Sequence, residues 1–322
     1  MLVRYIDRLA RGWKVWNRIR YPGIRAARGA NFYVDGTFTY GSGCSVGIGA
    51  NIIVQHGARL ELGDDCYVGR WVETGPTGRI KVGSHTSLQD RCIILGEVTI
   101  GRYCLFAPNV YISSGRHNFD VNPTWLIRDQ DVHVAGDARL SALYSRPVVI
   151  EDDCWLGINS VIRQGVTIGK GAIVGANSVV VRDVEPYTVV AGSPAEVIRK
   201  RLDFKPPKRL TATRSDDWPY FYSGFDLTQR SLAEGAARGA ITARNEFELS
   251  LDTATARHIH MIVKSTDGAQ CSLSTGGQLE QIGSEFREVV FNSDPPPEQG
   301  PRVRVLVVPS GATVMVKEAW VR

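Results

Sequence analysis

The stretch IEDDCWLGINSVIRQGVTIGKGAIVGANSVVV, residues 150–181, carries an aliphatic residue at every sixth position. This series is Ile150, Leu156, Ile162, Ile168, Val174 and Val180, and an earlier one is Val82, Leu88, Ile94, Ile100, Phe106 and Ile112. Strands alternate with period two and helices with period 3.6, so a strict period of six fits neither element alone. It is typical of a solenoid of short strands, in which each coil buries the face that its neighbour exposes. We therefore predict a mainly β protein built on a three-sided, left-handed parallel β-helix.

A small residue stands four positions after most of these apolar residues, where a tight corner requires one. Five of the six cysteines occupy such positions, namely Cys44, Cys66, Cys92, Cys104 and Cys154. Free cysteine behaves as a small buried hydrophobe, and the chain has no CxxC pair that would indicate zinc or redox chemistry. We interpret these cysteines as reduced core residues, and we expect corners in different coils to keep the thiols apart.

The 322 residues can hold one large or two medium domains. The regular spacing predicts a β-helix domain over residues 31–205, followed by a linker over 206–219 that contains PPKR and TATRSDDWP. Residues 220–322 contain strand-like runs with turn signals between them, such as HIHMIVKS and RVRVLVVPSGATVMVK. We expect this last part to be an antiparallel β-domain with the form of a sandwich.

Residues 1–30 carry a strong excess of Arg and Lys, and Asp7 is their only acid. One face of the predicted helix is apolar, with Leu2, Ile6, Leu9, Trp13 and Trp16. Residues 2–19 fit two roles, a peripheral contact with an anionic membrane surface or a cap over the first coil. No segment is long and apolar enough for a signal peptide or a membrane span, so we expect a cytoplasmic protein. The membrane role of residues 2–19 would place it at the inner face of the cytoplasmic membrane. The net charge is only +5, and we expect no nucleic-acid partner.

The repeat breaks between Ile112 and Ile150, which predicts a loop excursion over residues 113–149. His117 stands at its root, where a rigid scaffold can position a side chain that faces outward. An imidazole is suited to removing a proton from a hydroxyl or an amine near neutral pH, so His117 is the candidate general base. Asp90, Asn118 and Asp120 are candidates for orienting this base or holding an acceptor, and each suits a polar turn equally well.

Two phrases, APNVYISSGRHNFD at 107–120 and the run from Arg146 to Arg201, closely resemble the bacterial hexapeptide-repeat acyltransferases. This family includes galactoside, maltose and capsule or O-antigen sugar O-acetyltransferases, and the resemblance covers about residues 40–202. It implies a homotrimer in which acetyl-CoA lies between adjacent prisms. It also implies a carbohydrate acceptor that meets acetyl-CoA at His117, and no metal.

By the same resemblance, Trp155 lines the site, while the turns at Gly157 with Ile158 and at Gly175 with Ala176 approach the pantetheine arm. Arg182 stands where the family usually has a lysine. Arg199 and Lys200, together with Arg201, are implied to meet the CoA phosphates, which require cations or clusters of backbone N–H groups.

We therefore expect an acetyl-CoA-dependent O-acetyltransferase that acts by direct transfer on a sugar of a bacterial surface polysaccharide or its lipid-linked precursor. The alternatives are an N-acetyltransferase for a nucleotide-linked amino sugar and a non-catalytic scaffold of a glycan-assembly complex. A zinc-dependent carbonic anhydrase with the same prism is disfavoured, because no second histidine lies within ten residues of His117. The resemblance says nothing of the C-terminal part. Four of its aromatic residues could either stack on a glycan or fill the core of the domain, namely Trp218, Tyr220, Tyr222 and Trp320.

Overall fold

The computed structural model describes residues 21–75, 77–254, 256–266, 271–275, 278–292, 302–309 and 312–322. The chain divides into two compact units, Met1–Asp203 and Phe204–Arg322, and each unit has its own hydrophobic core. The predicted basic helix of residues 2–19 lies outside the described residues. In the described part of the chain, no helix combines the length and the apolar character that crossing a membrane requires.

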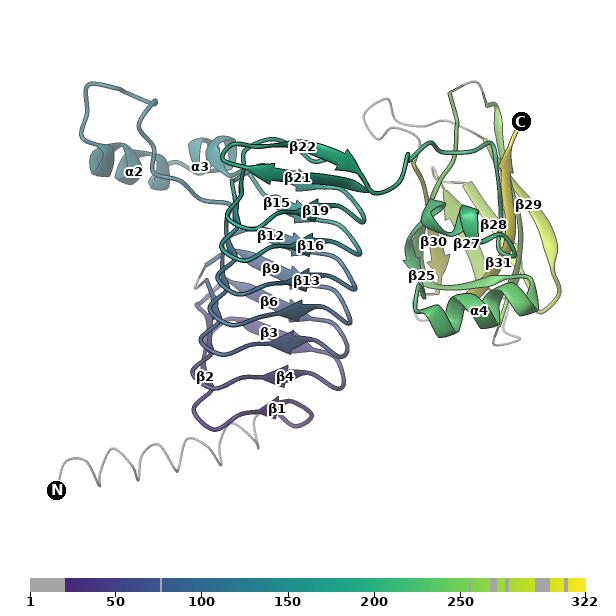
Figure 1. The fold of residues 1–322 in the computed structure, drawn as a ribbon, viewed down its shortest axis with the longest axis horizontal. Coiled ribbons are helices and arrows are strands. Elements are labelled where there is room, and N and C mark those ends of the chain that lie inside the picture. Colours follow the sequence, from purple (N-terminus) through teal and green to yellow (C-terminus); the bar gives the residue numbers. More distant parts are fainter. Residues whose placement is uncertain are drawn as a thin grey trace. The chain divides into compact units, whose positions relative to one another are not determined.

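The first unit is a prism of three sheets whose strands recur once per coil (Figure 1). Sheet A contains β1 (Arg25–Ala26), β4 (Ser45–Val46), β7 (Tyr67–Val68), β10 (Ser87–Leu88), β13 (Leu105–Phe106), β16 (Trp155–Leu156), β19 (Ile173–Val174), β21 (Thr188–Gly192) and β22 (Ala195–Lys200). Sheet B contains β2 (Asn31–Val34), β5 (Asn51–Val54), β8 (Glu73–Thr74), β11 (Ile93–Leu95), β14 (Tyr111–Ser113), β17 (Val161–Ile162) and β20 (Val179–Val180). Sheet C contains β3 (Thr37–Tyr40), β6 (Arg59–Leu62), β9 (Arg79–Val82), β12 (Val98–Ile100), β15 (Val148–Ile150) and β18 (Thr167–Ile168). All these strands pair in parallel except β22, which pairs antiparallel with β21 at the end of the stack.

The six-residue period creates this prism by placing one apolar side chain inside each face. No member of the two apolar series named above is more than 2% exposed. The corners between sheets A and B use the left-handed backbone conformation, with φ of 61° at Asn109, 58° at Asn159 and 56° at Asn177. Asparagine tolerates this conformation better than most residues, and these three side chains also bond to one another along the stack, at 2.8 and 2.9 Å. The predicted left-handed parallel β-helix is confirmed.

The corner cysteines are buried, and all five are free thiols. Burial raises the pKa of Cys92 to about 11 and raises the pKa of Cys154 as well, so both thiols are neutral at pH 7. The expectation that corners keep the thiols apart is wrong. Parallel in-register pairing places Cys44 next to Cys66 and Cys104 next to Cys154 in adjacent coils, because the residues that follow them are paired strand partners.

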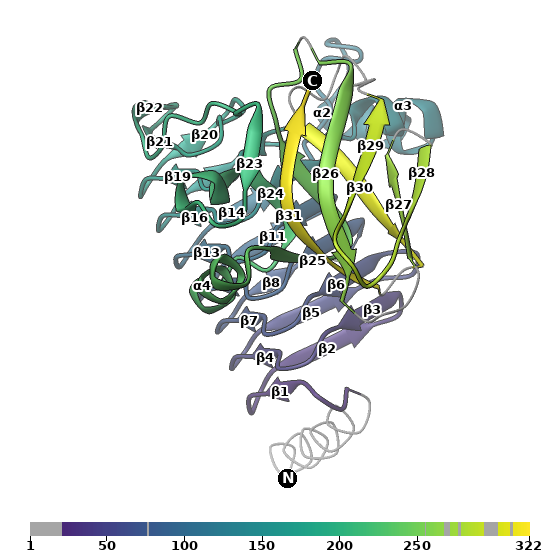
Figure 2. The ribbon, with the colours of Figure 1, turned by 90° about the vertical axis from the view of Figure 1, so that its right-hand side faces the viewer.

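The second unit is an antiparallel β-domain, as expected. Its elements are β23 (Arg209–Thr211), η1 (Ser215–Tyr220), β24 (Phe221–Phe225), α4 (Gln229–Arg238), β25 (Ile241–Ser250), β26 (His258–Ser265), β27 (Cys271–Thr275), β28 (Gln278–Ile282), β29 (Arg287–Asn292), β30 (Arg302–Val308) and β31 (Thr313–Val321). One connected sheet joins the strands in the order β28-β27-β30-β25-β31-β26-β29, with β23 on β31 and β24 on β25 (Figure 2). The outer strands β28 and β29 lie near each other, so the sheet curls and nearly closes on itself around the core. The predicted sandwich would instead enclose the core between two separate layers.

The aromatic residues that were candidates for glycan stacking are engaged by other parts of the same unit. Tyr220 and Tyr222 are buried, and Trp218 donates from its indole N–H to the carbonyl of Ala212 at 2.9 Å. The ring of Trp320 lies between the imidazole of His260, at 5.2 Å and nearly parallel, and the guanidinium of Arg209, at 5.1 Å. These contacts favour a structural role for the four side chains.

Lys170 is a fully buried lysine at the corner between sheets C and A. Burial lowers its pKa to about 8, although the carboxylates of Asp152 and Asp153 act in the opposite direction. Each of these carboxylates also meets an arginine, Asp152 with Arg102 at 3.2 Å and Asp153 with Arg201 at 3.0 Å. The last coils are therefore joined by a network of charges around the buried Lys170.

We expect Lys170→Met to change how the stability of the first unit depends on pH. Because the pKa in the folded state lies below the unfolded value, the unfolded chain binds more protons between pH 8 and pH 10.5, and the wild type gains stability as pH rises through this window. The difference in unfolding free energy between wild type and variant should shift by about 3 kcal/mol across the window. Urea unfolding at both ends of the window measures this shift, and Lys81→Met, on the exposed face of sheet C, is the control. An equal shift in both variants would contradict the assignment.

Candidate active site

The chain leaves the prism after β14 and returns at β15, as the interrupted repeat predicts. Between them lie two helices that the sequence analysis did not predict, α2 (Ile127–Ala135) and α3 (Ala138–Tyr144) (Figure 1). The side chain of Asp137 caps α3 by accepting from the N–H groups of Arg139 and Leu140, at 2.8 and 3.2 Å. The buried Gln130 ties α2 to the chain before it, since its amide donates to the carbonyl of Trp125 and accepts from the N–H of Asn122.

His117 lies at the root of this excursion, and its side chain is 85% exposed. Its Nδ1 is 2.7 Å from Oδ2 of Asp131, a residue of α2. The other oxygen of Asp131 accepts from the backbone N–H of Asn118 at 2.7 Å and from the amide of Asn118 at 3.0 Å. These bonds lower the pKa of Asp131, the backbone bond from Asn118 most and the bond from His117 next. Asn118 therefore contacts the partner of the candidate base, and Asp131 is a further candidate site residue, which the sequence did not indicate.

Asp120 is bound to Arg116, and in the described structure it makes no hydrogen bond or ion pair with His117. Arg116 donates to both carboxylate oxygens of Asp120, at 2.8 and 2.9 Å. The same guanidinium lies over the rings of Phe119, at 4.9 Å, and Tyr144, at 5.5 Å, which connects the two ends of the excursion. Phe119, two residues after His117, remains 55% exposed.

Asp90 lies at a different corner of the prism from the excursion. It follows β10, between sheets A and B, and accepts from the backbone N–H of Arg70 at 2.8 Å and from Nε of Arg70 at 2.8 Å. These bonds lower the pKa of Asp90 and tie one coil to the next. The structure therefore gives Asp90 a role in packing and does not bring it to His117 within one chain.

The two turns predicted to approach pantetheine stand directly above one another at the corner between sheets A and B. The pairing of β16 with β19 places Gly157 over Gly175 and Ile158 over Ala176. The N–H groups of the glycines are used within the stack, at 2.8 Å to Val174 and 2.7 Å to Val190. In the described part of the chain, no hydrogen bond is made by the N–H of Ile158 or of Ala176.

Packing alone accounts for the two glycines. A Cβ at Gly157 would lie 2.6 Å from the backbone nitrogen of Ala176, and one at Gly175 would lie 2.7 Å from the Cβ of Ala191. Both distances are shorter than real Cβ contacts, so adjacent coils leave room only for glycine. The groups at this corner that could bind a ligand are the N–H groups of Ile158 and Ala176, spaced by one strand separation of about 4.8 Å.

The remaining predicted cofactor residues divide between faces of the prism. Trp155 projects from sheet A and is 52% exposed, and Arg199 and Lys200 lie exposed on β22 at the end of the same sheet. Arg182 is exposed after β20, at the corner between sheets B and C that also bears the excursion. Arg201 is engaged elsewhere, because it donates to Asp153 and to the carbonyl of Gly171.

His117 and the two turns therefore stand at different corners of one prism, on opposite edges of sheet B. One face of the prism, which carries β14, β17 and β20, separates these corners. A group held at the Ile158 corner of one chain would lie a full face of the prism away from the His117 of that chain. We call the corner at His117 and the corner at Ile158 the two candidate half-sites.

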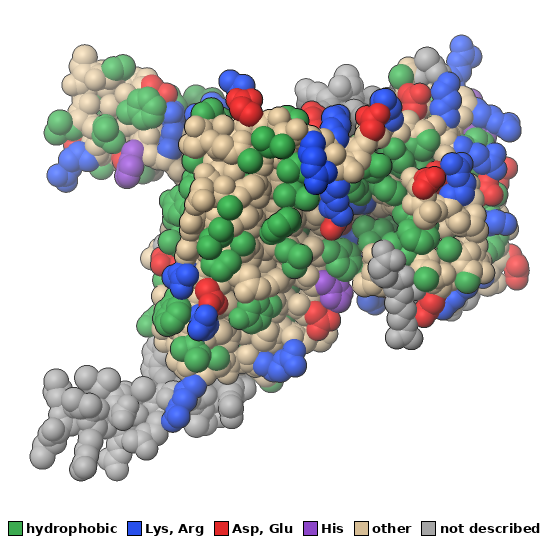
Figure 3. Space-filling view, viewed as in Figure 1, with side chains coloured by type: hydrophobic (Ala, Val, Ile, Leu, Met, Phe, Trp, Pro, Cys, Tyr) green, Lys and Arg blue, Asp and Glu red, His purple; other side chains and the backbone are tan. Residues whose placement is uncertain are grey.

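Large apolar side chains are exposed around both half-sites. Figure 3 shows hydrophobic side chains on the excursion and on the visible face of the prism. Those of the excursion are Phe119, Trp125, Leu126, Ile127, Val132 and Leu143, and those near the corner between sheets A and B include Leu105, Tyr111, Trp155 and Ile158. By contrast, the outward positions of β6 and β9 on sheet C are Arg59, Glu61, Arg79 and Lys81.

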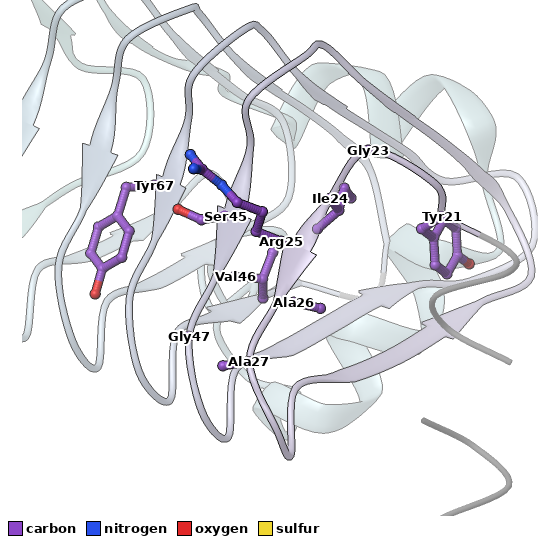
Figure 4. A pocket seen from close by; sticks show the side chains of 10 residues that line it. All are labelled: Tyr21, Gly23, Ile24, Arg25, Ala26, Ala27, Ser45, Val46, Gly47 and Tyr67. Atoms are coloured by element: carbon purple, nitrogen blue, oxygen red, sulfur yellow. The ribbon is translucent and has the colours of Figure 1, made fainter. Parts of the chain in front are cut away.

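A separate pocket of about 640 Å³ lies against the first coils, on strands β1, β4 and β7 (Figure 4). Tyr21, Ile24, Arg25 and Tyr67 are among the residues that line it. None of the predicted site residues lines this pocket. Among the described residues, no group of three His, Cys, Asp or Glu side chains could hold a metal ion.

Comparisons with known proteins agree with the repeat and its turns. Residues 147–182 match the family model described as the hexapeptide repeat of succinyl-transferase. A hexapeptide-repeat acetyltransferase from Vibrio cholerae, solved in complex with acetyl coenzyme A, is 33% identical over 43% of this chain and 69% of that chain, with a TM-score of 0.34. A maltose O-acetyltransferase from Clostridium difficile is 30% identical over 42% of this chain and 70% of that chain, with a TM-score of 0.30.

A putative acetyltransferase of Schizosaccharomyces pombe is 35% identical over 104 residues, which are 32% of this chain and 43% of that protein. The chain spans less than half the length of the curated relatives it matches. On the sequence identity shared with the Vibrio and Clostridium proteins, the chain belongs to the hexapeptide-repeat acetyltransferase family. Its β-helix is the part that the family shares.

Proposed function

We propose that this protein is an acetyl-CoA-dependent O-acetyltransferase that modifies a sugar of a bacterial surface polysaccharide or its lipid-linked precursor. The observation that carries the proposal is the exposed imidazole of His117, held at the root of the excursion on the β-helix of an acetyltransferase family. Nδ1 is engaged by Asp131, so Nε2 is the nitrogen available to an acceptor.

The proposed reaction is direct transfer without a covalent enzyme intermediate. His117 takes the proton of the acceptor hydroxyl, and the oxygen attacks the thioester carbonyl of acetyl-CoA. Collapse of the tetrahedral intermediate breaks the C–S bond, and the sulfur of CoA leaves with the proton returned by the imidazolium. A cysteine nucleophile is disfavoured because the corner cysteines are buried and burial raises the pKa of Cys92 and Cys154.

The corner between sheets A and B supports binding of the pantetheine arm. Pantetheine is peptide-like, and its amide carbonyls can accept from the N–H groups of Ile158 and Ala176. The exposed cations Arg182, Arg199 and Lys200 are suited to the phosphates of CoA.

We further propose that the working enzyme is a homotrimer in which one copy supplies His117 and its neighbour supplies the two turns. The separation of the two half-sites within one chain supports this, as does the apolar surface exposed around each of them. A cyclic assembly brings the excursion of every copy to the turn corner of the next and completes one site per interface.

A sugar acceptor suits the surroundings of His117. His117 and Phe119 are both exposed and stand on either side of the buried Asn118 in the sequence. With one ring face next to Arg116, the exposed remainder of Phe119 offers a flat apolar surface for the C–H face of a sugar ring. The relative from Clostridium difficile is named as a maltose O-acetyltransferase, in line with a sugar hydroxyl.

The alternative within the same chemistry is N-acetylation of a nucleotide-linked amino sugar, because a histidine base serves a hydroxyl and an amine equally. The alternative outside catalysis is a scaffold in a glycan-assembly complex. The test is release of free CoA thiol from acetyl-CoA, with and without a panel of neutral sugars, amino sugars and bacterial glycans. Release that requires a glycan supports the proposal, release only with amino sugars selects N-acetylation, and failure to bind acetyl-CoA would overturn the transferase.

A further inference from the structure

A single hydrogen bond holds the exposed imidazole of His117. The 2.7 Å contact between its Nδ1 and Oδ2 of Asp131 is the side-chain bond found for this ring among the described residues. Without it, an imidazole that is 85% exposed would rotate freely on the loop. The orientation of the candidate base therefore depends on a residue fourteen positions further along the chain.

The protonation state of Asp131 determines which nitrogen of His117 carries the proton. Bonds from Asn118 and His117 lower the pKa of the Asp131 carboxyl, so at neutral pH this group is ionised and can only accept. Nδ1 of His117 must then be the protonated nitrogen of the neutral ring. Nε2 keeps its lone pair and faces outward, as a base requires.

The carboxylate is itself held rigidly. Its second oxygen accepts two bonds from Asn118, one from the backbone and one from the side chain, and Asn118 is buried. The helix that carries Asp131 is fixed within the excursion by the buried Gln130 and by the hydroxyl of Ser141, which donates to the carbonyl of Val134 at 2.8 Å. The fold of the excursion therefore sets the position of the carboxylate.

We infer that Asp131 is a positioning residue that holds His117 in the Nδ1–H tautomer, with Nε2 directed at the acceptor. This inference rests on the proposed role of His117 as the base. When Nε2 takes the acceptor proton, the ring becomes an imidazolium whose charge the ionised Asp131 stabilises, and the imidazolium then gives that proton to the sulfur of the departing CoA. Asp131 remains ionised throughout and gains no proton.

The first test reads the tautomer and needs no substrate. In full-length protein labelled with ¹⁵N-histidine, solid-state NMR at about pH 8 distinguishes protonated from unprotonated ring nitrogens of neutral histidine. The signals of His117 are identified by their loss in His117→Gln. The control is Asp129→Asn, which removes the same negative charge from the exposed side of the same helix. We expect Nδ1 of His117 to be protonated both in the wild type and in this control. In Asp131→Asn the new amide can donate to Nδ1, so the proton should move to Nε2.

The second test separates positioning from folding. We expect Asp131→Asn to lower kcat about 10²-fold to 10⁴-fold with little change in KM for acetyl-CoA, because only proton transfer is affected. Asp131→Glu, which keeps the carboxylate, should recover part of this loss, and Asp129→Asn should match the wild type. A variant that simply unfolds the excursion would also change its thermal unfolding, which is measured alongside.

The two tests fail independently of the proposed function. Absence of acetyl transfer in the wild type would remove the proposed function, while the tautomer spectra would still decide the pairing of His117 with Asp131. An unprotonated Nδ1 in the wild type, or identical spectra in wild type and Asp131→Asn, would overturn the inference. So would an Asp131→Asn variant that retains wild-type kcat.

Discussion

Replacing His117 by asparagine should lower the rate of acetyl transfer about 10²-fold to 10⁴-fold and leave acetyl-CoA binding unchanged. Asparagine is polar and similar in reach, but it cannot take a proton from the acceptor. The side chain of His117 is largely exposed, so the substitution removes no core packing. The rate is measured by thiol release with the best wild-type acceptor, and acetyl-CoA affinity by calorimetry.

His85→Asn is the control for this prediction. His85 is another exposed histidine of the prism, stacked on Tyr103 with ring centroids 5.2 Å apart, at the corner between sheets C and A. We expect this variant to transfer acetyl groups like the wild type. A His117→Asn variant that keeps more than about a tenth of the wild-type rate would show that another group acts as the base.

The double variant Ile158→Pro/Ala176→Pro should weaken acetyl-CoA binding about 100-fold or more, because it removes the two N–H groups proposed to hold pantetheine. Each lost bond is worth about 1 to 3 kcal/mol when its partner remains buried. The fold should accept proline here. The pairing of β13 with β16 places Pro108 at the equivalent position of the preceding coil.

The matched control is Ile158→Ala/Ala176→Ser, which changes both side chains and keeps both N–H groups. Its affinity for acetyl-CoA should remain within a few-fold of the wild type, and circular dichroism should show that both double variants retain the β-helix. Equal affinity in the proline variant and the wild type would mean that pantetheine binds elsewhere.

The β-helix was predictable because its information is local and periodic. Each coil repeats the same requirement for one inward apolar residue, so Val82 to Ile112 and Ile150 to Val180 disclosed the period directly. The root of the excursion was visible for the same reason, since a period of six shows where it breaks. His117 stood out because it follows the last regular strand before that break.

The partner of His117 was not predictable in this way. Asp131 comes next to His117 only because α2 folds back, and the excursion has no repeat from which that path could be read. The run IRDQDVHVA, with its buried positions Gln130 and Val134 one helical turn apart, was the available signal for a helix. Recognising that helix would have made Asp131 a candidate partner for His117. The helix also carries Asp129, and only the contact between His117 and Asp131 in the folded chain selects one acid over the other.

Asp90 and Arg201 were selected from the sequence as site candidates, but the structure uses both to join neighbouring coils. Both are charged residues near site-like motifs, but stacking of the coils pairs Asp90 with Arg70 and Arg201 with Asp153. Such pairs depend on which residues of neighbouring coils are in register. In the C-terminal unit, alternation likewise predicted the strands, while the connection of all of them in one curled sheet depends on pairings between distant segments.

The activity of hybrid oligomers shows whether two copies of the chain share one active site. His117→Asn and the double proline variant, each inactive at low acetyl-CoA, are co-expressed with different tags, and only assemblies that carry both tags are purified. In a cyclic trimer of mixed composition, one interface in three joins an intact His117 to intact turns, so we expect about a third of wild-type activity. Hybrids as inactive as their parents would contradict a site shared between two copies.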